Sequence, residues 1–261
     1  MGEAIQASDI SDASEWSAAP QSLTLARDEV HVWRVGLNHP GTRVGELRAL
    51  LSREEGERAA RFHFEKDRAH FIVARGVLRT LLGLYLGSPP AELGFVYSPF
   101  GKPALAHGSG AHPVRFNVSH SCALALYAFA RGREVGVDVE HARADFAGED
   151  IAARFFSARE VAALRAVEPD RRTEAFFNCW TRKEAYIKAI GEGLSHPLDS
   201  FAVSLSPGEP AALLHSADAS EPPRWSFREL KPAPGYAAAL VVEGHDWRLR
   251  RYDWQASAGG A

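Results

Sequence analysis

The chain has 261 residues, of which 46% are hydrophobic and 24% are charged, and its formal net charge is −3. This composition is typical of a globular protein with room for one large domain or two small ones. The slight negative charge provides neither the basic surface that nucleic acid requires nor a polybasic membrane anchor. The longest apolar run, residues 123–130, is too short to span a bilayer. The totals therefore argue against nucleic-acid and membrane proteins and leave the soluble enzyme classes open.

The termini and the cysteines indicate where the protein works. The first twenty residues are acidic and contain neither a basic start nor an apolar stretch, so they do not form a secretory signal. We expect a cytoplasmic protein whose ends, residues 1–22 and 255–261, are disordered. Cys122 and Cys179 lie far apart in no metal-ligand spacing, which favours buried free thiols over a disulfide. The 11 histidines are scattered, so we expect no zinc site.

In chain order, the first half begins with a strand predicted over residues 30–35. Helical periodicity then extends over residues 45–86, with Ser52 as a helix start and Gly87 as a helix stop. Extended segments follow, separated by turns, and are predicted at 95–105, 114–130 and 133–140.

The second half repeats this order of elements. A long helical region is predicted over residues 151–190, followed by a loop. Strands are then predicted at 201–206, 224–230, 235–243 and 247–252. We therefore predict an α+β fold, built as a pseudo-dimer of two similar halves over residues 23–130 and 131–254. The space between two such halves is the first place to expect a site.

A pair of carboxylates interrupts the β-branched stretch VGVDVEH at 135–141. Because side chains alternate along a strand, Asp138 and Glu140 share one face while Val137 and Val139 point into the core. The pair could simply lie on a solvated strand face. It could also bind Mg²⁺, which takes carboxylate oxygens and completes its shell with water and substrate phosphates.

A second candidate lies on the helix predicted to end near residue 190. Glu184 and Lys188 are four residues apart and share a helix face. They could form an ordinary ion pair in solvent. The residues around them are apolar, which favours a partly buried face. The apolar residues are Trp180, Tyr186, Ile187 and Ile190. A third carboxylate and a lysine at such a place would suit a site for a metal and a phosphate.

Two polar stretches could bind an anion. The stretch FNVSHS at 116–121 contains Asn117, Ser119 and His120, but no GxSxG sequence that would mark a nucleophile. It is either a strand with a hydrogen-bonded histidine or a source of donors to a phosphate. The stretch GKP at 101–103 is either a turn or a loop that presents Lys102 to an anion.

Taken in order, GKP, FNVSHS, VGVDVE and WTRKEAYIKAIGEGL resemble the Sfp-type 4′-phosphopantetheinyl transferases, with the match running from about Ser52 to Ser200. The resemblance implies transfer of the phosphopantetheine arm of coenzyme A to a serine of an apo acyl or peptidyl carrier protein, with release of 3′,5′-ADP. It also implies a monomer in which coenzyme A and Mg²⁺ lie between two α+β halves.

The resemblance also implies roles for individual residues. Asp138, Glu140 and Glu184 are expected to hold the Mg²⁺, and Lys188 is expected to stabilise charge beside it. Glu184 is then the group that takes the serine proton, either directly or through a water on the metal. Contacts to coenzyme A are expected from Arg58, Lys102, Asn117, Ser119, His120 and Lys188. One departure is Glu55, which stands where some relatives have lysine.

Two other functions fit the same residues. A Mg²⁺-dependent hydrolase of nucleotide pyrophosphates would use the same carboxylates to activate water. A non-catalytic protein that binds coenzyme A or a carrier is also conceivable, but it would be expected to lack Asp138, Glu184 or Lys188, and all three are present.

Overall fold

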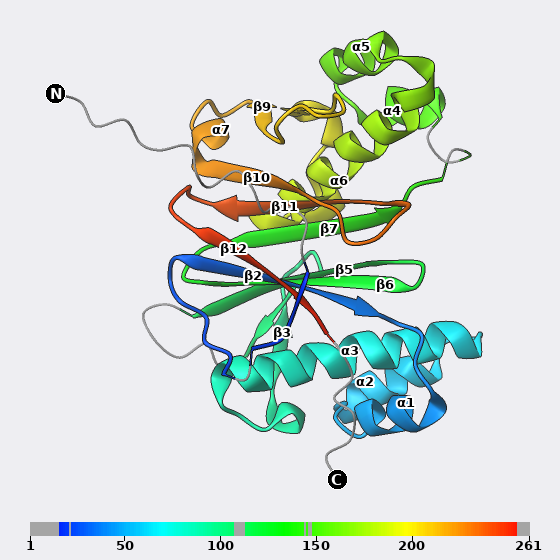
Figure 1. Ribbon diagram of the computed structural model, residues 1–261, viewed down its shortest axis with the longest axis vertical. Coiled ribbons are helices and arrows are strands. Elements are labelled where there is room, and N and C mark those ends of the chain that lie inside the picture. Colours follow the sequence, from blue (N-terminus) through cyan, green and yellow to red (C-terminus); the bar gives the residue numbers. More distant parts are fainter. Residues whose placement is uncertain (1–15, 21, 107–112, 144, 146–147, 255–261) are drawn as a thin grey trace, which may run out of the picture.

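The computed structural model describes residues 16–20, 22–106, 113–143, 145 and 148–254. Within these residues the chain forms four layers, in which helices cover the outer faces of two sheets (Figure 1). The predicted α+β class is confirmed. The segments 1–15 and 255–261, for which disorder is predicted, lie outside the described residues.

The larger sheet is covered on its outer side by the helices of the first half (Figure 1). Its strands, in spatial order, are β1 (Ser17–Ala18), β12 (Arg248–Asp253), β2 (Glu29–Gly36), β6 (Leu124–Arg131) and β5 (Val114–Ser121). The helices are α1 (Gly41–Arg48), α2 (Arg53–Ala60) and α3 (Glu65–Leu86). After the 3₁₀ turn η1 (Pro90–Glu92), a separate hairpin pairs β3 (Phe95–Tyr97) with β4 (Pro103–Leu105).

The smaller sheet belongs to the second half. Its strands, in spatial order, are β10 (Trp225–Leu230), β11 (Tyr236–Glu243) and β7 (Val135–His141). The helices of this half are α4 (Glu149–Phe155), α5 (Ala158–Ala166), α6 (Arg172–Ile190) and α7 (Glu221–Arg224). A small ribbon pairs β8 (Ala202–Val203) with β9 (Leu213–His215). The 3₁₀ turns are η2 (Pro169–Arg171), η3 (Gly193–Ser195) and η4 (Leu198–Ser200).

Three apolar clusters fill the spaces between the four layers. The alternation of side chains on the strands supplies two of them at once, because Leu126 and Ala128 of β6 pack against the smaller sheet while Tyr127 and Phe129 pack against α3. By length and composition α3 could cross a membrane, but 56% of that apolar stretch is buried inside the fold. This burial is typical of the core helix of a globular protein.

The two halves begin their helical parts in the same way. Ser52–Glu55 forms a capping box at the start of α2, and Ser157–Glu160 forms a second one at the start of α5. Both glutamates are buried, and each pairs with a basic residue of the next long helix, Arg79 of α3 or Lys183 of α6. These repeated contacts agree with the prediction of two similar halves.

Several details differ from the sequence-based expectations. The helical region 45–86 is broken into α1, α2 and α3, and the helical region 151–190 is broken into α4, α5 and α6. The predicted disorder of residues 1–22 is wrong for Ser17–Ala18, because β1 pairs with β12 and the Trp16 indole donates a hydrogen bond to the Lys231 carbonyl oxygen at 3.0 Å. Both cysteines are free, but only Cys179 is buried, since Cys122 lies exposed in the turn between β5 and β6.

One strand crosses between the halves. β12 follows β11 in the chain, yet it pairs in parallel with β2 of the larger sheet. The C-terminal part of the chain therefore completes the sheet of the first half, and the two halves are interleaved rather than separable at one boundary. The predicted boundaries near residue 131 stay a prediction.

Candidate active site

The close approach of β7 to α6 creates the site. A Cβ atom at Gly136 would overlap the carbonyl oxygen of Ala185, so only glycine lets the strand lie this near the helix. Asp138 and Glu140 follow at alternate positions and therefore lie on the same face of β7 as this glycine. That face is covered by the last turns of α6, which carry Lys188.

The Lys188 side chain reaches from α6 to β7 and to β5. Its Nζ donates hydrogen bonds to Asp138 Oδ1 at 2.6 Å and to Ser119 Oγ at 3.0 Å. The Ser119 hydroxyl donates in turn to the same carboxylate oxygen at 2.8 Å. Asp138 is only 2% exposed, so a solvated strand face is excluded for this residue. Lys188 pairs with Asp138 rather than with Glu184 on its own helix.

Three side chains of β5 join this strand to β7 and fix the two carboxylates. Asn117, Ser119 and Ser121 accept hydrogen bonds from the backbone N–H groups of Val137, Val139 and His141. The Ser119 and Ser121 hydroxyls also donate to Asp138 and Glu140, each at 2.8 Å. Each serine therefore satisfies an edge N–H of β7 and orients the preceding carboxylate. Through these three side chains, β5 of the larger sheet is hydrogen-bonded to β7 of the smaller sheet.

The site carries more negative charge than its one lysine compensates. Burial, and then the neighbouring charge of Asp138, raise the pKa of Glu184 to about 7. Lys188 acts in the opposite direction, and Glu140 adds to the increase. The pKa of Glu140 is also raised, first by burial, although the Ser121 hydroxyl partly offsets this. A positive ligand beside these carboxylates would relieve their repulsion.

The donor set fits a divalent cation. Asp138 Oδ2 is buried and has no hydrogen-bond partner within the described residues, although such oxygens are normally satisfied. In the part of the chain that the structure describes, no three His, Cys, Asp or Glu side chains are already gathered as a complete metal cluster. Mg²⁺ does not require one, because it commonly binds one or two carboxylates together with water and substrate phosphates. Asp138, Glu140 and Glu184 could supply these ligands.

A cavity of about 660 Å³ opens beside this cluster. Glu184 and Lys188 line it from α6, and Asn117 lines it from β5. The remaining wall is formed by two loops, and these are residues 99–103 and 191–195. The cavity therefore combines two lysines, two carboxylates and an apolar wall that includes Phe100, which suits an anionic ligand with a flat apolar part.

The predicted contacts to coenzyme A divide into two groups. Lys102, Asn117 and Lys188 line the cavity. The Ser119 hydroxyl accepts two hydrogen bonds and donates one inside the protein, so it has no capacity left for a ligand. The second group includes His120, which is exposed on β5 and is absent from the cavity lining.

Arg58 lies away from the cavity lining. It is exposed on α2, and its guanidinium lies 5.3 Å from the centre of the Phe71 ring. The departure at Glu55 has a structural reason, because this carboxylate is 7% exposed and binds Arg75 and Arg79. At position 55 the chain therefore has an internal ion cluster and no phosphate ligand.

The sequence interpretation missed the residues that position the site. Ser121 was treated only as part of a polar strand, and its spacing of two from Ser119 was the available signal. Glu134, which pairs with Lys102, lies inside the extended segment predicted at 133–140 and one residue before β7, and it carries no pattern of its own. Lys183 belongs to the same helix as Lys188, but the structure places it in the core with Glu160.

Comparisons with known proteins agree with this geometry. The family described as 4′-phosphopantetheinyl transferase, N-terminal, matches residues 43–131, and the 4′-phosphopantetheinyl transferase superfamily matches residues 134–241. The chain is 40% identical to 4′-phosphopantetheinyl transferase HetI of Nostoc sp. over 233 residues, which cover 89% of this chain and 95% of HetI. It is 32% identical to 4′-phosphopantetheinyl transferase Sfp of Bacillus subtilis, over 60% of this chain and 67% of Sfp.

A solved structure, a holo-(acyl-carrier-protein) synthase from Bacillus anthracis in complex with CoA (3′,5′-ADP), is 20% identical. The match covers 43% of this chain and 96% of that one, with a TM-score of 0.35. The sequence matches cover both halves of the fold and the residues of the site. They show that this chain belongs to the 4′-phosphopantetheinyl transferase superfamily.

Proposed function

We propose that this chain transfers the 4′-phosphopantetheine group of coenzyme A to a serine of an apo acyl or peptidyl carrier protein, depends on Mg²⁺ and releases 3′,5′-ADP. The observation that carries the proposal is the ion pair between Lys188, which lines the cavity, and the buried Asp138. Lys188 uses two of its three N–H donors on the protein, and Asp138 keeps one carboxylate oxygen unpaired. Both groups therefore have capacity left for a ligand.

The reaction requires positioning and charge stabilisation more than covalent help from the protein. A bond forms between the serine oxygen and phosphorus while the bond from phosphorus to the departing ADP breaks. Lys188 lines the cavity and is placed to stabilise negative charge on phosphoryl oxygens. Mg²⁺, held by Asp138, Glu140 and Glu184, would neutralise the pyrophosphate and polarise its oxygens.

Glu184 is suited to receive the serine proton. A general base works best when its pKa lies near the working pH, and the pKa of this carboxyl is raised to about 7. Glu184 also lines the cavity, so a substrate hydroxyl can approach it. The neighbouring carboxylates raise its proton affinity, and Lys188, four residues away, limits the increase.

The test is intact-protein mass spectrometry of apo carrier proteins incubated with this chain, coenzyme A and Mg²⁺. We expect each accepted carrier to gain the mass of one phosphopantetheine, and we expect a chelator to abolish the gain. Cleavage of coenzyme A without modification of acyl or peptidyl carriers would instead support the Mg²⁺-dependent hydrolase and overturn the proposal. The carriers should include fatty-acid, polyketide and nonribosomal peptide types.

We further propose that a monomer is active, in the cytoplasm, without nucleic acid or membrane. β5, β7 and α6 all come from one chain, and together they supply the carboxylates, the lysine and the cavity. Transfer activity should therefore coincide with the monomer peak in size-exclusion chromatography. Activity confined to a larger oligomer would contradict this part of the proposal.

A further inference from the structure

The loop at the cavity mouth is a compact turn on a small hairpin. The backbone N–H of Ser98 donates to the carbonyl oxygen of Lys102 at 2.9 Å, and Gly101 N donates to Ser98 O at 2.9 Å. Gly101 has a φ of 82°, a value that glycine adopts without strain. The hairpin of β3 and β4 lies outside both main sheets. Its strands pack against the core of the first half through Phe95 and Leu105, and Lys102 adds a contact from the turn itself to α6.

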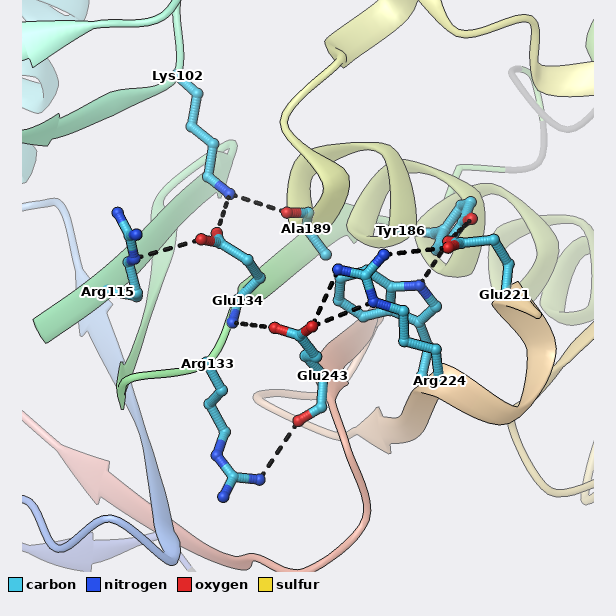
Figure 2. A network of polar contacts seen from close by, with 10 residues as sticks. Lys102, Arg115, Arg133, Glu134, Tyr186, Ala189, Glu221, Arg224 and Glu243 are labelled. Atoms are coloured by element: carbon cyan, nitrogen blue, oxygen red, sulfur yellow. Dashed lines mark hydrogen bonds and ion pairs between the residues drawn. The ribbon is translucent and has the colours of Figure 1, made fainter. Parts of the chain in front are cut away.

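Lys102 fastens the turn to the body of the protein. Its Nζ donates to the carbonyl oxygen of Ala189, in the last turn of α6, at 3.1 Å and lies 3.4 Å from Glu134 Oε2 (Figure 2). A cation at the C-terminus of a helix is favoured by the helix dipole. Two of the three ammonium donors are thus used, and Lys102 also lines the cavity. One N–H donor is left for a ligand.

Glu134 shares its carboxylate between two cations. Oε2 contacts Lys102, and Oε1 lies 3.2 Å from Arg115 Nε (Figure 2). The backbone of Glu134 is held as well, because its N–H donates to Glu243 Oε2 at 3.2 Å and its carbonyl oxygen accepts from Glu243 N at 3.0 Å. Arg224 donates to the other oxygen of Glu243 at 2.9 Å.

Glu134 is therefore a fixed anion between the cavity loop and the smaller sheet. We propose that Glu134 is a positioning residue for ligand binding: it holds Lys102, and with it the turn at residues 98–102, so that the remaining ammonium donor faces an anion in the cavity. The anion would be the nucleotide phosphates of coenzyme A, and in this respect the inference rests on the proposed function.

The sign of the effect distinguishes positioning from simple electrostatics. Glu134 is negative and lies near a cavity that would bind a polyanion. If it acted only through its charge, its removal would strengthen binding, because like charges repel. If it positions Lys102, its removal weakens binding even though the repulsion is relieved.

The experiment compares E134Q with the wild-type chain by calorimetric titration of coenzyme A and by transfer kinetics on an apo carrier. We expect Kd and KM for coenzyme A to rise about fivefold, with kcat changed less than twofold. E174Q is the matched control, because Glu174 lies in the first turn of α6, roughly 20 Å along the helix at 1.5 Å per residue from Ala189, which Lys102 contacts, and it should leave Kd and KM unchanged.

A double variant gives the second readout. K102M should weaken binding of coenzyme A, and E134Q added to K102M should weaken it no further, because the two residues act as one unit. Unchanged or tighter binding by E134Q would overturn the inference, as would a fall in kcat together with a lower melting temperature, which indicates a merely structural role. If the wild-type chain binds coenzyme A but transfers nothing, the proposed function fails while the effect on binding still tests Glu134.

Discussion

Two lysines on α6 use their charges in opposite ways. Lys183 is completely buried, and its three N–H donors reach Leu198 O at 2.6 Å, Phe201 O at 2.7 Å and Glu160 Oε2 at 2.8 Å. Lys188, little more than one turn further on, has a 26% exposed side chain, and among the described residues it donates to Asp138 and Ser119 alone. Both are ion pairs between a lysine and a buried carboxylate, yet they differ in how many bonds remain to be made.

The carboxylates show the same difference. Glu160 uses both oxygens, because Oε2 also accepts from Ser157 N and Oε1 accepts from Val203 N, each at 2.7 Å. Asp138 leaves Oδ2 without a partner among the described residues. A buried pair whose bonds are all made inside the protein can only support the fold. A pair that keeps a lysine donor at a cavity wall and one carboxylate oxygen without a partner can also bind a ligand.

The largest expected effect concerns stability at the pair of Lys183 and Glu160, whose hydrogen bonds are all made inside the protein. Lys183→Met should lower the free energy of unfolding by about 3–5 kcal/mol, because it leaves the Glu160 carboxylate buried without its cation. Lys188→Met should cost about 1–2 kcal/mol, since Lys188 is itself partly exposed and Asp138 keeps its bond from Ser119. Urea denaturation followed by circular dichroism measures both. A larger loss for Lys188→Met would reverse the comparison.

The next effect concerns activity at the site around the pair of Lys188 and Asp138. Glu184→Gln and Asp138→Ala should each reduce transfer about a thousandfold while the chain remains folded, because a proton acceptor or a cation ligand is removed. Glu192→Gln is the control, since Glu192 also lines the cavity but is bonded to His196. Full transfer by either site variant would remove the catalytic assignment, whereas inactivity of the control would show that any charge change in the cavity is disruptive.

The sequence could predict those features of the comparison that are set by local geometry. The alternation along β7 placed Val137 and Val139 in the core and put Asp138 with Glu140 on the opposite face, because neighbouring residues on a strand point to opposite sides. Ser52 was predicted as a helix start for a similarly local reason, its capping hydrogen bond to the backbone N–H of Glu55.

The sequence could not predict which charges meet across the fold. Glu184 and Lys188 share a helix face, so a local argument pairs them, yet Lys188 bonds Asp138, which is 50 residues away in the chain. The need for glycine at position 136 is visible only when α6 lies against β7. Nor does the sequence distinguish Lys183 from Lys188, because the partners of Lys183 lie in α5 and in the segment after α6.

A smaller effect is expected from pH in the chain without ligands. The pKa of Glu184 is raised from 4.5 to about 7 by burial and by Asp138, so folding favours its protonated form. This contribution to stability is complete below pH 4.5, declines as the pH rises and is lost above about 7, a change on the order of 2–3 kcal/mol. The free energy of unfolding of the wild type minus that of Glu184→Gln, measured from pH 4 to 8, should fall by this amount as the pH rises. A difference that does not change with pH would mean that burial and Asp138 do not shift the pKa of Glu184.

The smallest effect is expected at an exposed ion pair on the same helix. Arg171 and Glu174, at the start of α6, lie 2.9 Å apart, and both side chains are about half exposed. Water and salt screen such a pair, so a double-mutant cycle of Arg171→Ala and Glu174→Gln should give a coupling below about 0.5 kcal/mol. The corresponding cycle of Lys183→Met with Glu160→Gln should give several times more. If the two couplings were equal, neither burial nor the number of internal bonds would decide how much an ion pair on α6 stabilises the fold. The intermediate loss of stability expected for Lys188→Met would then have no physical basis.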